Sequence, residues 1–96
     1  MDKLNQDLQV EFEFTNKHGL HTRPGAVLVG IAKKFTCDIT ITNLTTQGKP
    51  ANAKSLMKLM VSSIKCGHRI LIQFQGPDAQ VAMEAIMEGL QSGLGE

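Results

Sequence analysis

The sequence has no tryptophan or tyrosine, only four phenylalanines and only two cysteines among its 96 residues. Neither charge dominates, because ten lysines and arginines face nine aspartates and glutamates, for a formal net charge of +1. A general nucleic-acid binder usually carries a strong basic excess and aromatic residues for stacking, so the composition argues against one. No apolar run approaches the roughly 20 residues of a membrane span, and the first residues do not resemble a signal peptide. We therefore expect a cytoplasmic protein without direct membrane insertion.

The scarcity of cysteine also argues against metal chemistry. Cys37 and Cys66 lie in no CxxC or similar ligand spacing, so we expect two free thiols rather than a disulfide or a metal site. His18 and His21 are three residues apart, which makes a metal pair conceivable. No neighbouring cysteine or carboxylate completes a tetrahedral site, and Gly19 interrupts the helical spacing between them. The sequence therefore predicts neither a metal ion nor a cofactor.

Apolar periodicity predicts one domain over residues 8–96, preceded by a polar tail over residues 1–7. Apolar and polar side chains alternate over 8–14, 35–42 and 69–75, as is typical of half-buried strands. A weak strand over 49–52 should be short or lie at an edge, because Pro50 cannot donate to a ladder. Helical spacing is found over 24–34, 56–61 and 79–91, with Ser55 and Asp78 as N-cap candidates and Gly93 as a stop.

The predicted order of elements is β-α-β-β-α-β-α. Each alternating strand buries one face, so helices should cover one side of an antiparallel sheet and leave the other side to solvent. The sequence therefore predicts an α+β fold: a two-layer open-faced β-sandwich, in which three helices cover one side of a four-stranded antiparallel sheet.

The most informative stretch is His18-Gly19-Leu20-His21-Thr22-Arg23-Pro24-Gly25. Pro24 is tolerated in the first turn of a helix, where N–H groups have no intrahelical partner. His21 then lies at a helix N-terminus, which favours an anion, and Arg23 adds a planar phosphate donor. On position alone, a histidine near a helix start is more often a surface or capping residue. An imidazole beside a guanidinium at such a site could nevertheless carry a phosphoryl group.

The stretch Gly-Leu-His-Thr-Arg-Pro resembles the active-site signature of HPr, the histidine-containing phosphocarrier family of the bacterial sugar phosphotransferase system. The resemblance continues through 54–59 and 76–78, and therefore covers nearly the whole chain. Pro-Gly after the arginine, where the family usually has Pro-Ala, and the ending Gly93-Leu94-Gly95-Glu96 resemble the fructose-specific HPr-like domain. That domain is fused to a IIA domain in a diphosphoryl-transfer protein.

The resemblance implies a function. Enzyme I would donate a phosphoryl group to His21, with Thr22 and Arg23 beside it in the motif, and His21 would pass the group to a IIA domain. The family uses the Nδ1 nitrogen, which the sequence does not reveal. Such a protein would be a stoichiometric phosphohistidine carrier and a monomer, not an independent catalyst.

Two alternatives of different kinds remain at the level of sequence. The chain could be a general-sugar or nitrogen-branch HPr, or a non-catalytic HPr-like module that regulates by binding. The intact His-Thr-Arg-Pro motif favours a carrier, because the regulatory relatives lack the active histidine.

Other residues take a structural interpretation beside a functional one. Ser55 is first a helix cap, although it aligns with a serine that some Gram-positive relatives phosphorylate for regulation. His68 is most simply a solvated residue at a strand start. Ser62-Ser63 stands where the family commonly has Leu-Gly, so the turn after the short helix should differ.

A partner-docking surface is predicted beside His21. The resemblance and the helical faces assign it the apolar residues Val27, Ile31, Leu56, Met57 and Met60. Val27, Ile31 and Met57 come from two helices, and we expect them to form a joined exposed patch, because a sheet covers only one side of each helix. Arg23, Lys33 and Lys58 would lie at its rim.

Overall fold

A computed structural model describes residues 6–96, which form the predicted order of four strands and three helices. The strands are β1 (Gln6–Glu13), β2 (Asp38–Asn43), β3 (Ala51–Asn52) and β4 (Arg69–Gly76), and the helices are α1 (Thr22–Ala32), α2 (Leu56–Val61) and α3 (Ala79–Gln91). Residues 6 and 7, which we assigned to the tail, are the first residues of β1; the rest of the predicted tail lies outside the described residues.

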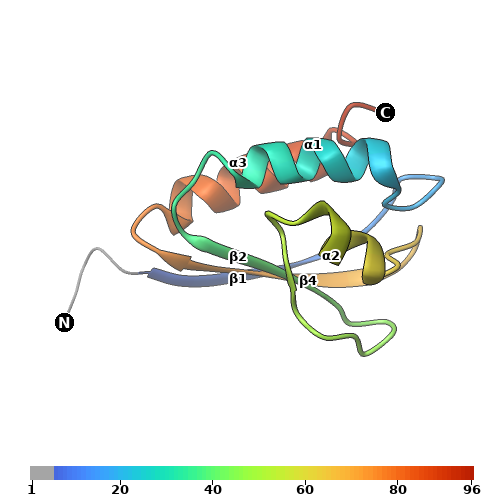
Figure 1. Cartoon of the computed structure of the whole chain (residues 1–96), viewed down its shortest axis with the longest axis horizontal. Helices are drawn as coiled ribbons and strands as arrows, with labels where there is room; N and C mark the ends of the chain where they lie inside the picture. Colours follow the sequence, from blue (N-terminus) through green and yellow to red (C-terminus); the bar gives the residue numbers. More distant parts are fainter. Residues whose placement is uncertain (1–5) are drawn as a thin grey trace.

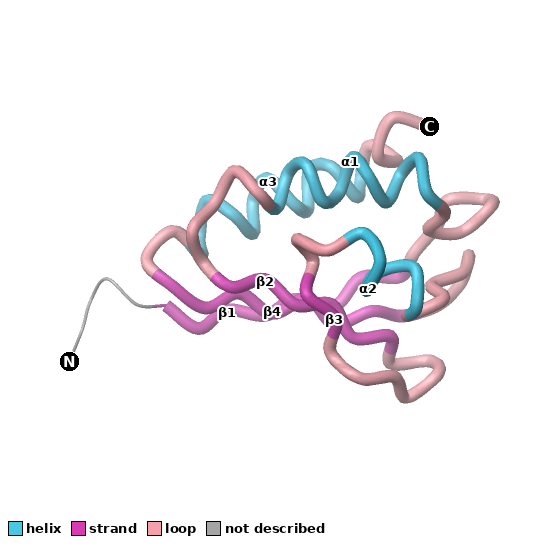
Figure 2. Tube along the Cα trace, viewed as in Figure 1, coloured by secondary structure: helices cyan, strands magenta, loops and turns pink. Residues whose placement is uncertain are grey.

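The four strands form one antiparallel sheet in the order β1-β4-β2-β3. All three helices lie on the same side of it, so the other face is open (Figures 1 and 2). β3 is two residues long and occupies an edge, as Pro50 requires. The predicted α+β open-faced sandwich is therefore confirmed.

The core lies between the sheet and the helices and is built from the predicted alternation. Inward residues of β2 and β4 are fully buried, as are those of α1 and α3; the set includes Ile39, Ile41, Ile70, Ile72, Phe74, Leu28, Ala32, Ile86 and Leu90. Removing such a side chain from water stabilises the fold by about 1.5–3 kcal/mol relative to leaving it exposed. Among residues 6–96, no helix is long and apolar enough to span a membrane.

One expectation about α1 is wrong. We predicted that Ile31 would be exposed, yet it is half-buried and packs against the core. α3 runs beside α1, and a Cβ added at Gly89 of α3 would stand 2.7 Å from the Ile31 Cδ1. The argument from the sheet alone failed because a helix in a layer is also covered by the helix next to it.

The two predicted N-caps behave differently. The Ser55 hydroxyl accepts a hydrogen bond from the Lys58 N–H at 3.3 Å, which confirms it as the cap of α2. Asp78 precedes α3 but makes no capping bond. Its carboxylate instead accepts the backbone N–H groups of Thr36 and Cys37, both at 2.8 Å, and so ties the start of α3 to the segment before β2.

The contact between Asp78 and the segment before β2 shifts the pKa values of Asp78 and Cys37. The bond from the Thr36 N–H is the main reason that the pKa of Asp78 lies below its usual range. Burial, aided by the hydrogen bond to Asp78, raises the pKa of the Cys37 thiol to about 11. Cys37 is therefore a protonated core residue, and both cysteines are free thiols, as predicted.

Candidate functional site

The loop that leads into α1 is held against the segment after α2. Gly19 adopts φ +74°, and a Cβ there would stand 2.9 Å from the Ile64 carbonyl oxygen, so both its conformation and its surroundings require glycine. The next residue, Leu20, is buried and donates its N–H to the same carbonyl at 2.9 Å. The backbone is thus fixed one residue before His21.

His21 occupies the N-cap position of α1. Its backbone is extended, with φ −95° and ψ −172°, and its carbonyl accepts the Gly25 N–H at 2.9 Å. The imidazole makes no capping bond, and the first turn of α1 contains no acidic residue. The free N–H groups and the positive end of the helix dipole therefore stay available to an anion beside His21.

Thr22 and Arg23 are the first two residues of α1, and both are exposed next to His21. Pro24 follows as the third helical residue, where a missing N–H removes no helical bond. The structure therefore brings the three predicted site residues together at one helix end.

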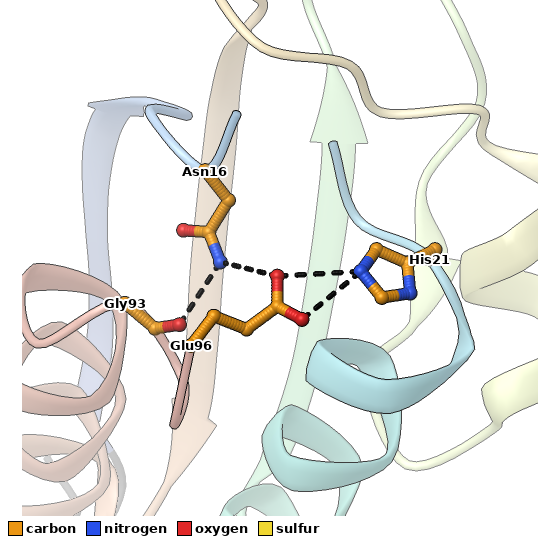
Figure 3. Close-up of polar contacts among 4 residues, drawn as sticks. All are labelled: Asn16, His21, Gly93 and Glu96. Atoms are coloured by element: carbon orange, nitrogen blue, oxygen red, sulfur yellow. Dashed lines mark hydrogen bonds and ion pairs between the residues drawn. The ribbon is translucent and has the colours of Figure 1, made fainter. Parts of the chain in front are cut away.

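A fourth residue, which we did not predict, contacts the imidazole. The Glu96 carboxylate lies against His21, with its two oxygens 3.1 and 3.2 Å from Nε2 (Figure 3). Within residues 6–96, the other ring nitrogen, Nδ1, has no hydrogen-bond partner. The carboxylate thus engages one nitrogen of the ring and leaves the other open.

Glu96 reaches His21 because the chain turns sharply after α3. Gly93 adopts φ +84°, the Leu94 N–H bonds the Gly89 carbonyl at 2.9 Å, and the Gly93 N–H bonds the Leu90 carbonyl at 3.2 Å. These two bonds make a Schellman motif. Leu94 is 1 % exposed and anchors the turn in the core.

Asn16, also not predicted, ties this turn to the loop before α1. Its side-chain amide donates to the Gly93 carbonyl at 2.9 Å and reaches the Glu96 Oε1 at 3.5 Å (Figure 3). Gly93-Leu94-Gly95 was a signal for the turn, because glycine followed by an apolar residue is typical of a Schellman ending. No local pattern indicates which side chain the turn approaches.

The predicted docking residues lie at different depths. Val27 and Met57 are exposed, at 40 % and 78 %. Leu56 and Met60 are half-buried between α2 and α1, because a Cβ at Gly25 would stand 2.8 Å from the Met60 Cε and 3.0 Å from the Leu56 Cδ1.

The exposed apolar surface of α2 includes a residue that we did not single out. Val61, which we did not single out, is 78 % exposed one turn after Met57. Both side chains line a groove of about 590 Å³ between α2 and residues 46–51, and Lys49 and Lys58 also line it. The apolar surface of α2 thus faces the loop between β2 and β3.

We expected His68 to be a solvated residue, and this expectation is wrong. Its Nδ1 accepts the Lys65 N–H at 3.1 Å and lies 3.0 Å from the side-chain amide of Asn43, which is fully buried. The Asn43 Nδ2 also bonds the Ser62 carbonyl, and its Oδ1 accepts the N–H groups of Thr45 and Thr46. His68 is therefore part of a structural network around the end of α2.

The turn after α2 contains Ser62-Ser63, where the family commonly has Leu-Gly, and its difference from the family's turn stays a prediction. Ser63 adopts φ +51°, a left-handed conformation in which glycine costs least. Among residues 6–96, no three His, Cys, Asp or Glu side chains gather as metal ligands.

Comparisons with known proteins agree with this geometry. The family model described as "PTS HPr component phosphorylation site" matches residues 8–92. The multiphosphoryl transfer protein of Salmonella typhimurium is 49 % identical over 96 residues, which are 99 % of this chain and 26 % of that protein. The phosphocarrier protein HPr of Vibrio cholerae is 43 % identical over 77 residues, which are 80 % of this chain and 87 % of that protein.

The fold comparison gives the same family. A crystal structure of HPr from Thermoanaerobacter tengcongensis aligns with a TM-score of 0.85 and 34 % identity, covering 93 % of this chain and 97 % of that one. The chain spans about a quarter of the length of the multiphosphoryl transfer proteins that it matches. A signature histidine at an open helix N-terminus, in this fold and with this family match, shows that the chain belongs to the HPr family of phosphotransferase-system phosphocarriers.

Proposed function

We propose that His21 accepts a phosphoryl group from enzyme I and passes it to a IIA domain. The observation that carries this proposal is the position of His21 at the open N-terminus of α1, with Arg23 two residues later and no acidic residue in the first turn. A phosphoryl group in transit spreads negative charge over three oxygens, and oriented N–H groups with a guanidinium stabilise that charge.

The transfer needs no further reactive group on this chain. A ring nitrogen of neutral His21 forms a bond to phosphorus while the bond to the donor's histidine breaks, and the electron pair of that bond returns to the donor ring. The unprotonated nitrogen of a neutral imidazole is itself a nucleophile, so the step needs no added base. The protein therefore acts as a stoichiometric carrier in the cytoplasm, and not as an independent catalyst.

The fructose branch is the acceptor pathway that we propose. Its support is the similarity to multiphosphoryl transfer proteins at 45–51 % identity, together with Pro24-Gly25 and the Gly-Leu-Gly ending. A general-sugar or nitrogen-branch HPr is the alternative, supported by the HPr of Vibrio cholerae at 43 % identity. Phosphoryl transfer to purified IIA domains of each branch separates them.

Partners would dock on the apolar surface beside His21. Val27 and Met57 would provide the exposed contacts, while Leu56 and Met60 support them from below, and Ile31 contributes at the edge toward α3. Methionine adapts its shape to different partners, so one small surface can serve both donor and acceptor.

The test is phosphorylation in vitro. Incubation with enzyme I and phosphoenolpyruvate should add one phosphoryl group that is stable in base and labile in acid. His21→Ala should accept none, whereas His68→Ala, the matched control, should accept one. A wild-type chain that stays unphosphorylated would favour the regulatory module instead, and phosphate on His21→Ala would assign the reaction to another residue.

A further inference from the structure

We propose that Glu96 is a positioning residue for phosphoryl transfer: it holds the proton on Nε2 of His21, so that Nδ1 keeps the lone pair that attacks phosphorus. This inference rests on the proposed function and adds a residue to it. The contact that carries it is the pair of distances, 3.1 and 3.2 Å, between the two Glu96 oxygens and Nε2 (Figure 3).

The chemistry of the two groups fixes where the proton lies. An ionised carboxylate only accepts hydrogen bonds, so the ring nitrogen that faces it must be the one that carries hydrogen. A neutral imidazole has one N–H, so a hydrogen bond that keeps hydrogen on one nitrogen leaves the other nitrogen with a lone pair. With hydrogen on Nε2, the nucleophilic nitrogen is Nδ1, which is the nitrogen without a partner among residues 6–96.

The carboxylate also counters the charge that the reaction creates. When the Nδ1 lone pair forms the N–P bond, the bond from phosphorus to the donor's histidine breaks and its electron pair stays on the donor. The proton remains on Nε2, so the His21 ring becomes cationic. A carboxylate hydrogen-bonded to the imidazole on the side away from the reaction orients the ring and stabilises this cation, as the aspartate does in a Ser-His-Asp triad.

The structure holds the carboxylate in place through the turn after α3. Leu94 is buried, Gly93 is bonded by Asn16, and the Asn16 amide also reaches Glu96. The Glu96 side chain is 24 % exposed, against 44 % for His21, so the carboxylate is the better shielded partner. Partial exposure keeps the expected effect moderate, because water competes for the same hydrogen bond.

The first measurement needs no phosphoryl donor. Long-range ¹H–¹⁵N spectra of the ¹⁵N-labelled free protein report which nitrogen of neutral His21 carries hydrogen. The wild type should show hydrogen almost only on Nε2. Glu96→Gln keeps an acceptor but loses the charge and should shift the tautomers slightly; Glu96→Ala should shift them most.

The second measurement is the rate of phosphoryl acceptance from enzyme I. One hydrogen bond to an ion at a half-exposed site corresponds to a loss of about three- to tenfold for Glu96→Ala, with Glu96→Gln between it and the wild type. Glu88→Gln on α3 makes the same charge change at an exposed carboxylate and should keep the wild-type rate. Asn16→Ala should give a smaller loss than Glu96→Ala.

Several outcomes would overturn the inference. One is a Glu96→Ala protein with the wild-type tautomer and rate; another is a slower rate with an unchanged tautomer. Equal losses in Glu88→Gln and Glu96→Gln would reduce the effect to long-range charge. If the wild type accepts no phosphoryl group, the proposed function fails and the role in transfer fails with it, whereas the spectra still show whether Glu96 holds the proton.

Discussion

His21 and His68 lie in two regions that use the same side chain in opposite ways. Donors at Nδ1 of His68, from Lys65 and Asn43, require its proton to be on Nε2, and the carboxylate at Nε2 of His21 requires the same tautomer there. The two rings differ at Nδ1: in His68 this nitrogen accepts two hydrogen bonds, and in His21 it has no partner among residues 6–96. The histidine that we propose as the nucleophile is the one whose Nδ1 has no partner among residues 6–96.

The largest expected effect is that of Arg23→Lys, a substitution in the region around His21. Lysine keeps the charge but loses the planar fork of the guanidinium, so a transition state with three charged oxygens loses an oriented donor. We expect phosphoryl transfer to slow about 10²- to 10³-fold, with the thermal transition unchanged because Arg23 is exposed. Rapid-quench measurement of transfer from enzyme I checks this.

Arg69→Lys is the matched control for that substitution. Arg69 is an exposed arginine on β4, 3.7 Å from Glu11, and far in sequence from the signature. The Arg69→Lys protein should transfer the phosphoryl group at the wild-type rate. An unchanged rate in Arg23→Lys, in both directions of transfer, would leave the helix N-terminus alone to stabilise the phosphoryl group.

Asn43→Ala tests the other region, the hydrogen-bond network around His68. Asn43 is 0 % exposed and its amide bonds Ser62, His68, Thr45 and Thr46, so its loss leaves buried polar groups without partners. We expect the free energy of unfolding to fall by about 2 kcal/mol, while His21 still accepts a phosphoryl group in the folded fraction. Urea titration followed by circular dichroism measures the change.

Asn52→Ala provides the comparison for that loss. Asn52 is exposed, and its side chain accepts the Lys54 N–H at 2.9 Å, its one hydrogen bond among residues 6–96. Its substitution should change stability by less than about 0.5 kcal/mol. If both variants lose the same stability, the network around His68 has no special role.

The smallest expected effect is that of Met57→Glu, which separates partner binding from phosphoryl transfer. Met57 is 78 % exposed, so Met57→Glu opens no cavity and should leave the thermal transition unmoved. Binding to enzyme I and to the IIA domain should weaken together, by about tenfold each, because one surface serves both. Calorimetric titration of each pair gives the two values.

Val81→Glu is the control for docking. Val81 is a 52 % exposed apolar residue on α3, so the same kind of substitution is made outside the predicted surface. Its binding should match that of the wild type. Unfolding of Met57→Glu would instead make Met57 a core residue and remove it from the docking surface.

The sequence predicted what depends on local pattern. Alternation and helical spacing gave every element of the fold, and the spacing of His21, Arg23 and Pro24 gave the open helix end. These features follow from residues that are neighbours in the chain, where periodicity and capping operate.

The sequence failed where a contact joins distant segments. Glu96 reaches His21 from 75 residues away, and Asn43 reaches His68 across 25 residues, so no spacing rule could pair them. Ile31 was misjudged for the same reason, because Gly89 of α3 lies beside it. The packing of α1 against α3 decides the contacts of Glu96 and Ile31, whereas the pairing of β2 with β4 brings Asn43 to His68.

The turn after α3 has a consequence for the order in which the molecule is completed. His21 and Glu96 stand 75 residues apart in a chain of 96, and contacts of such long separation tend to form late in folding. A chain still leaving the ribosome exposes the histidine and the arginine long before Leu94 has docked. The Glu96 carboxylate can therefore reach His21 only after α3 and the turn at Gly93 have folded.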